Sequence, residues 1–389
     1  MGRRARHPGW LFLVLLAAAD AAAQDYPPIT ASDFNLEDFN GVITGSSRIM
    51  GMGGAFGAVA EGVAAFPANP AALARRYPYS TDWFDYDIAI DWLLPGVGED
   101  LDYDNSGLPG LQEGKFVFVL GGASLQFGRF GIGLYVRGRG YEVTASDGQI
   151  YSFELLEGNL GAAYEIVKDT FYLGLGMAVS TMEAQRALVE DPVRADDFET
   201  LVRFESGFWR IGALWLLPDT PWSFGASAAM AAELARTSGT ARAVGGRHLP
   251  MGVVRPWEGM LSVAYLHPFK TSAEDRRFIR GALDLMVLGP STDAITLKGF
   301  MLQLRQPVGR DPSFGFHLGA ESEVISDWWQ VRAGTYLEPA RRPGTWGRLH
   351  FTAGTEVKLF TLIWTWKASV AFDVADRYTN LCVGIGFWH

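Results

Sequence analysis

From residue 79 to the C-terminus the sequence repeats one pattern, in which apolar side chains occupy every second position. The repeating segments end in clusters of Pro, Gly, Asp or Asn, and alternation of this kind is typical of β-strands with two different faces. In 130–141, one face carries Phe130, Ile132, Leu134 and Val136, and the other carries Gly131, Gly133, Tyr135, Arg137, Arg139 and Tyr141. Segments 171–179 and 381–388 alternate in the same way. The pattern predicts strands with one apolar face and one small or polar face.

The composition narrows the class of protein that such strands build. Hydrophobic residues make up 48% of the chain and aromatic residues 13%, with a mean hydropathy of +0.07. After residue 23 no stretch of eighteen apolar residues remains, so the sequence does not predict a membrane-spanning helix. Because only helices and closed barrels satisfy every backbone group in lipid, we expect a transmembrane antiparallel β-barrel. A periplasmic all-β protein is the alternative.

The first residues predict export. Arg3, Arg4 and Arg6 form a basic start, Trp10–Ala19 is an apolar run, and Ala21–Ala23 fit a small-residue cleavage site. We therefore expect residues 1–23 to be a signal peptide for general secretion.

The strand number follows from the segments, of which about fifteen can be distinguished. Bacterial single-chain barrels have an even number of strands, and the weakest segment is 295–306. We predict about 14 strands, with 16 as the alternative, and assign residues 77–389 to the barrel. Some connections are short and others long, which is typical of this architecture.

A glycine- and alanine-rich stretch, 45–73, precedes the first strand. It carries few charges and is too rich in glycine to form a good helix of its own. Such a segment needs an enclosure, so we predict that residues 24–76 form a plug inside the lumen of the barrel. Asn69 before Pro70 is a natural helix cap with proline at the first helical position.

Residues 44–73 resemble the N-terminal plug of the FadL family of outer-membrane transporters. The resemblance rests on the order of a few plug-motif residues, namely Arg48, Gly51, Gly53, Gly54, Asn69 and Pro70. A second similar run, Val331–Pro339 followed by His350–Gly354, lies near the C-terminus. The plug departs from the family in one respect, because Glu61 is the only charged residue between 61 and 68.

The resemblance implies an outer-membrane channel of a Gram-negative bacterium, for passive uptake of hydrophobic small molecules such as long-chain fatty acids. Family relatives of the PorV type act instead as secretion or assembly partners, and the plug motif does not separate the two. For a hydrophobic ligand we predict contacts with the plug residues Met50, Met52, Phe56 and Phe66. For its polar head group we predict Arg137, Arg139 and Arg332.

Other functions find little support in the sequence. The net charge of −10 argues against nucleic acid as a partner, and Cys382 has no second cysteine with which to pair. The histidines have no short paired spacing, so we predict no metal site and no cofactor. A lumen cluster of His317, Glu321, Arg332, His350 and Glu356 is expected, but no serine accompanies it as a nucleophile, so we predict no enzyme. Expected partners are membrane lipid, the ligand and the barrel-assembly machinery, which recognises terminal aromatic residues such as Phe387 and Trp388.

Overall fold

The computed structural model describes residues 26–39, 41–76, 83–96, 102–108, 112–144, 148–189, 192, 194–239, 247–269, 277–342, 345, 347–362 and 365–388. The predicted signal peptide lies outside these residues. No helix within them is both long and apolar enough to cross a membrane.

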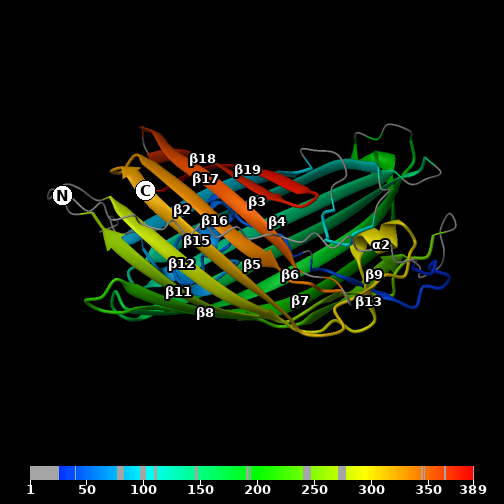
Figure 1. Cartoon of the computed structure of the whole chain (residues 1–389), viewed down its shortest axis with the longest axis horizontal. Coiled ribbons are helices and arrows are strands. Elements are labelled where there is room, and N and C mark those ends of the chain that lie inside the picture. The colour runs from blue at the N-terminus through cyan, green and yellow to red at the C-terminus, as the bar shows by residue number, and fades with distance from the viewer. Residues whose placement is uncertain are drawn as a thin grey trace, which may run out of the picture.

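Fourteen strands within the described residues form a closed antiparallel barrel (Figure 1). In chain order they are β2 (Phe84–Pro95), β3 (Gln112–Phe127), β4 (Phe130–Thr144), β5 (Ile150–Val167), β6 (Phe171–Ala187), β7 (Phe198–Leu216), β8 (Trp222–Ala229), β11 (Glu258–Pro268), β12 (Phe278–Leu288), β15 (Ser313–Ile325), β16 (Trp329–Glu338), β17 (Arg348–Thr361), β18 (Thr365–Ala375) and β19 (Tyr378–Trp388). The last strand pairs with the first, so that Leu381 faces Leu94 and Trp388 faces Asp87. The predicted fold class and the predicted 14 strands are confirmed.

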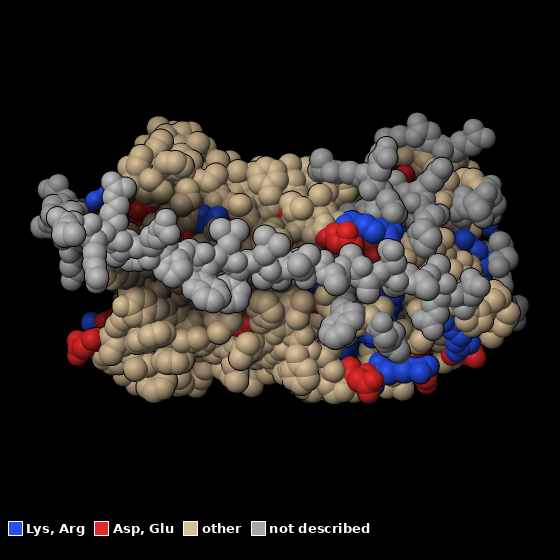
Figure 2. All heavy atoms as spheres, viewed as in Figure 1, with Lys and Arg blue, Asp and Glu red and all other residues tan. Residues whose placement is uncertain are grey.

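The alternation of the sequence separates the two faces of the wall. On β4, Leu134 is 53% exposed on the outside, whereas Tyr135 on the inside is 1% exposed. Outward positions on β6 and β19, such as Leu175 and Val383, are likewise exposed and apolar. Figure 2 shows a mostly uncharged outer surface along the middle of the barrel, with charged side chains gathered toward the ends. Such an apolar band is what a bilayer requires.

The two ends of the barrel differ. At one end, here called the turn end, connections are short: Gly128 and Arg129 alone join β3 to β4. At the other, the loop end, residues 289–312 join β12 to β15 and contain β13 (Ala294–Ile295), α2 (Leu297–Met301) and β14 (Pro307–Val308). α2 lies at the right in Figure 1. Residues 295–306, which resembled a strand, therefore contain a helix that begins where the Thr296 hydroxyl accepts the Gly299 N–H.

A small sheet adds to the loop end. β1 (Asn35–Glu37) pairs in parallel with both β10 (Gly252–Arg255) and β13, while β10 pairs with β9 (Ala232–Gly239). β10 and β11 form one line of pairing that is interrupted at Pro256 and Trp257. The interruption follows from proline, which has no N–H to donate to the ladder. A further short helix, η3 (Ala195–Asp197), precedes β7.

Candidate functional site

The N-terminal segment runs through the whole lumen. Pro28 pairs with Leu304 at the loop end, and the segment then descends toward the turn end, where β2 begins. The part of the segment that follows residue 46 contains α1 (Ser47–Gly51), η1 (Val63–Ala65) and η2 (Pro70–Ala74). We call residues 47–74 the plug. Between them, these residues contact all fourteen barrel strands.

The plug rests on glycines of the wall. Inward-facing glycines let its backbone approach the strands closely, and a side chain at any of them would overlap the plug: Gly131, Gly174, Gly212, Gly225, Gly319 and Gly334. The Phe66 ring lies over two more, Gly161 and Gly176. On the plug itself, Gly53 and Gly54 have positive φ angles of 60° and 78°, a conformation that disfavours side chains. The interface is therefore packed backbone against backbone over much of its area.

Carboxylates of the wall hold the plug backbone. The Asp284 carboxylate on β12 accepts the N–H groups of Phe56 and Gly57, both at 2.9 Å. Asp87 and Asp91 on β2 accept the N–H groups of Val63 and Ser47 at 2.8 and 2.9 Å. Hydrogen bonds to an ionised acceptor are about twice as strong as neutral ones. They satisfy plug N–H groups that its short helical turns leave free.

An ionic cluster joins the plug to three wall strands, β12, β15 and β16. The Glu321 carboxylate on β15 pairs with Arg48 of the plug at 2.8 Å, with Arg280 at 3.0 Å and with Arg332 at 3.2 Å. The Glu321 side chain is completely buried. Replacing this carboxylate by a neutral group would leave three guanidinium groups facing one another.

Glu61 is a second anion in this cluster, and it belongs to the plug. It pairs with Arg48 at 2.6 Å and with Arg75 at 3.9 Å. Burial by itself raises the pKa of the Glu61 carboxyl, but Arg48 and Arg75 lower it by more, so that the pKa lies below its ordinary value. The lone plug carboxylate therefore stays ionised.

The expected lumen cluster of five residues divides in two. Glu321, Arg332 and Glu356 are linked, with Arg332 donating to Glu356 at 3.3 Å. His317 and His350 lie on opposite sides of the Tyr336 ring, with ring centroids 5.5 and 4.2 Å from it. His350 contacts Asp373 at 2.8 Å and Glu338 at 3.1 Å, whereas His317 contacts the Gly53 carbonyl. Within the described residues no group of three metal-ligating side chains is found.

The residues predicted for the apolar part of a ligand lie at the interface of plug and wall. Met50, Met52, Phe56 and Phe66 are at most 1% exposed. Met52 packs on Gly319 and Gly334, and Phe56 lies under the Arg48 guanidinium at 4.9 Å. In this conformation of the protein their contacts fasten the plug. Their part in ligand binding stays a prediction.

The three arginines predicted for a head group face the lumen and are engaged by acceptors. Arg137 donates to the Thr44 hydroxyl at 2.7 Å and pairs with Glu157 at 2.8 Å. Arg139 pairs with Asp38 at 2.5 Å, and Arg332 belongs to the cluster around Glu321. Asp38 lies on the N-terminal segment, directly after β1.

The plug motif has a clear structural part in this arrangement. The Asn69 side chain accepts a hydrogen bond from the Ala71 N–H and donates to the carbonyls of Gly57 and Ala213. These bonds connect η2 to an earlier part of the plug and to β7. Pro70 starts η2, and Gly51 packs on Gly354 of β17.

One region at the loop end of the lumen is apolar and lies beside the ion pairs of Glu37 and Asp38. Phe34 and Leu36 of the N-terminal segment are 0% and 1% exposed, and Phe300 of α2 lies between Phe34 and Phe153, at ring distances of 6.1 and 5.3 Å. β1 and α2, which fill this space, are a short strand and a short helix held by a few backbone bonds.

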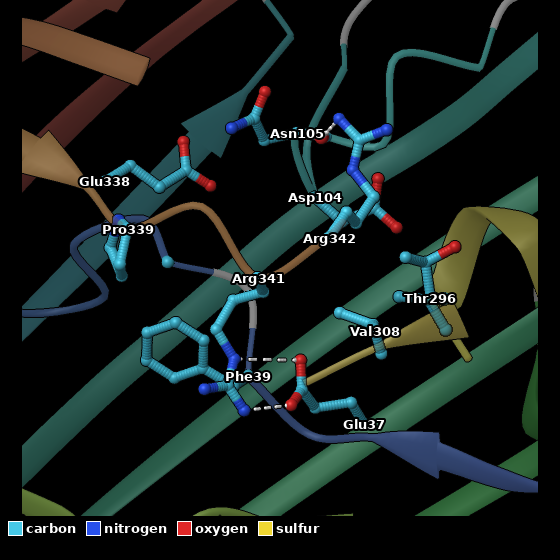
Figure 3. Close-up of a pocket in the computed structure, with 12 residues that line it drawn as sticks. Glu37, Phe39, Asp104, Asn105, Thr296, Val308, Glu338, Pro339, Arg341 and Arg342 are labelled. Atoms are coloured by element: carbon cyan, nitrogen blue, oxygen red, sulfur yellow. Dashed lines mark hydrogen bonds and ion pairs between the residues drawn. The ribbon is translucent and has the colours of Figure 1, made fainter. Parts of the chain in front are cut away.

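Two hollows adjoin the N-terminal segment. The loop-end hollow has about 370 Å³ of empty space, part of it open to solvent (Figure 3). Glu37 and Arg341 form an ion pair at its wall, and Arg342 donates to the Asn105 carbonyl (Figure 3). The second hollow, here called the vestibule, has about 560 Å³, again partly open, and lies between the plug and β2, β17, β18 and β19.

Several solved structures have a fold similar to that of this protein. A Pseudomonas aeruginosa FadL homologue is 15% identical over 90% of this chain and 98% of its own, with a TM-score of 0.54. The protein has the fold of the FadL-type channels. The CymD monoaromatic hydrocarbon channel has a similar fold, with 12% identity over 88% of this chain and 96% of its own and a TM-score of 0.58. The Ralstonia pickettii toluene transporter TbuX is also similar, with 12% identity over 88% of this chain and 97% of its own and a TM-score of 0.55. No family model and no curated protein sequence matches the chain.

Sequence reasoning missed the glycine seats and the wall aspartates. Each residue was visible in the sequence, because most barrel strands carry a glycine on their polar face, and Asp87, Asp91 and Asp284 interrupt apolar runs. Their common role depends on the register between distant strands and the plug, which no local pattern reveals.

Proposed function

We propose that the protein is a non-enzymatic outer-membrane channel for the passive uptake of hydrophobic small molecules, with long-chain fatty acids or similar compounds as its ligands. The observation that carries the proposal is the apolar region at the loop end of the lumen. There Phe34 and Leu36 of the N-terminal segment fill a space walled by Phe153 and Phe300. A hydrophobic ligand that replaced this segment would gain the same desolvated surroundings. The named hydrocarbon channels of the same fold support this class of ligand.

The charges on the N-terminal segment support a ligand with a carboxylate. Asp38 neutralises Arg139 and lies 3.7 Å from Arg255, and Glu37 pairs with Arg341. When the segment leaves, these two carboxylates leave with it, and buried arginines remain. A fatty acid brings one carboxylate and an alkyl chain, so it neutralises one of these arginines and restores the apolar packing, and an unpaired buried charge is costly.

Binding of two matched ligands tests the proposal. The purified protein in detergent is titrated with oleate and with oleyl alcohol, which have the same alkyl chain and differ in whether they carry a carboxylate. We expect saturable binding of both, tighter for oleate, and loss of the difference in Arg139→Ala. Absence of saturable binding of either ligand contradicts an uptake function. Equal affinities contradict the role of the arginine and leave the hydrophobic channel in place.

The extent of plug contact favours one other function. Because residues 47–74 contact all fourteen strands, a sealed barrel that serves as a secretion or assembly partner is the second candidate. Recovery of a stoichiometric exported protein with the barrel after mild solubilisation supports this candidate, whereas recovery of the barrel alone counts against it.

A further inference from the structure

The plug seals the lumen unevenly. Around the vestibule, lumen-facing wall residues on four adjacent strands are only half-buried: Ala89, Glu356, Lys367, Ser369 and Gly386. On the opposite wall, the corresponding positions Gly161, Ala163, Gly212 and Leu214 are buried under the plug. Water therefore reaches into the lumen along β17, β18, β19 and β2.

The vestibule has the chemistry of a hydrated space. Arg48, Glu61, Asp87, Glu356 and Lys367 line it, so cations and anions alternate around a hollow of about 560 Å³. Because the hollow is partly open to solvent and buried waters need polar partners, its charged groups can be hydrated. Phe56, Ile88 and Phe387 also line the hollow, so its charged groups lie beside an apolar part of the lining.

One small contact closes the inner end of the vestibule. The Ser47 N–H of α1 donates to Asp91 at 2.9 Å, and the Ser47 hydroxyl lies 2.5 Å from the Ser369 hydroxyl of β18. Behind this contact Leu93 and Cys382 are completely buried. We call Ser47, Asp91 and Ser369 the latch.

A second polar hollow begins a few residues away on the same segment. Gly41 lines the loop-end hollow and Ser46 lines the vestibule, so only residues 42–45 of the chain separate the two. A movement of this stretch that released Ser47 would bring the two polar hollows together.

We propose that the protein has a second activity, a latched aqueous path for small hydrophilic solutes. This path runs from the loop-end hollow past residues 42–47 into the vestibule, and the latch closes it. The vestibule and the latch lie apart from the apolar space around Phe34 and Phe300, and the two routes adjoin only at the loop-end hollow, where Glu37 and Arg341 lie.

A reversible crosslink tests the latch. The short distance between the Ser47 and Ser369 hydroxyls suits a disulfide, so Ser47→Cys/Ser369→Cys is built in a Cys382→Ala background to exclude mispairing. Proteoliposomes are assayed for swelling in arabinose with the protein oxidised and then reduced. We expect swelling at the protein-free rate when oxidised and recovery on reduction.

A weakened latch gives the converse measurement. Asp91→Asn should raise the swelling rate about tenfold or more, the change in open population expected for weakening a hydrogen bond to a charged acceptor. Filling the vestibule from the plug side with Ala64→Phe should lower the rate in that background without touching the latch. These variants keep the path testable even where the double cysteine variant folds poorly.

The control places the same crosslink within the wall. Thr361 and Thr365 face each other across the β17–β18 turn with hydroxyls 3.3 Å apart, so Thr361→Cys/Thr365→Cys reports any effect of oxidation alone. Equal swelling of the oxidised and reduced latch variant overturns the path.

Oleate uptake is measured in the same vesicles. Loss of both swelling and oleate uptake on oxidation overturns the separation of the two paths, whereas loss of swelling with retained oleate uptake supports it. Absence of oleate uptake in the wild type contradicts the proposed function and leaves the latch result unaffected.

Discussion

Glu321→Gln is the substitution with the largest expected effect on the plug. The side chain keeps its shape and loses its charge, while Arg48, Arg280 and Arg332 remain around it in a completely buried position. Removing one member of a buried ion pair costs about 3–5 kcal/mol when the remaining charge is left uncompensated. Because Arg48 keeps Glu61 and Arg332 keeps Glu356, we expect the lower end, about 3 kcal/mol. Here the cost falls on the contact between plug and wall, since Arg48 belongs to the plug and the other residues to three wall strands.

Hydrogen exchange of the plug amides measures this cost locally. If the barrel stays closed and only the plug is released, the exchange of amides in residues 48–57 should accelerate about a hundredfold, the equivalent of that energy. Amides of the barrel ladder should not change, because the ladder is closed without the plug. Glu199→Gln is the matched control, since Glu199 pairs with Arg186 at an exposed site. Its effect should stay within about fivefold, as is usual for surface ion pairs. Unchanged plug exchange in Glu321→Gln would refute the reasoning.

Three further predictions concern the plug and the buried charges. Gly53→Val should destabilise the plug by about 1–3 kcal/mol, because the added side chain overpacks the site and strains a residue with a positive φ angle. The effect is measured as faster cleavage of the plug by protease, and Gly148→Val, at an exposed loop glycine that also has a positive φ angle, should leave this cleavage unchanged. Because the pKa of Glu61 is lowered, its contribution to plug stability is complete above the ordinary value of about 4.3 and is lost only as the pH falls through the lowered pKa. Glu61→Gln should therefore speed plug exchange relative to the wild type by the same factor at pH 7 and at pH 6, and a larger factor at pH 7 would contradict this. Arg348→Ala, which removes the partner of Glu338 at 2.8 Å, should lower the thermal stability of the barrel, whereas Arg194→Ala at an exposed pair should not change it measurably.

The barrel was predictable from the sequence because the features that specify each strand lie close together along the chain. Alternation along each strand sets which side chains face lipid, as Leu134 and Tyr135 show, and turn residues set where each strand ends. The segment 295–306 illustrates the limit, since its apolar residues fit a strand, and only the Thr296 cap indicates the short helix that forms.

The lumen was predictable only in outline. A glycine-rich segment with few charges before a barrel indicates a plug, whereas the ion pair of Arg48 with Glu61 is seen only in the structure. The partners of Arg139 and Glu321 could not be read from the sequence, because Asp38 and Arg48 are separated from them by 101 and 273 residues. Such pairs are fixed by the register of the whole barrel around the plug.

Deletion of residues 44–73 tests the central claim, that this segment closes a barrel that takes up hydrophobic molecules. Wild type and deletion are reconstituted side by side and assayed for liposome swelling in arabinose and for saturable oleate uptake. The deleted protein should still insert and remain heat-modifiable on gels, because its hydrogen-bond ladder is closed without the plug. We expect swelling to rise and saturable oleate uptake to fall. If the deletion leaves both unchanged, the segment does not close the lumen and the account is contradicted.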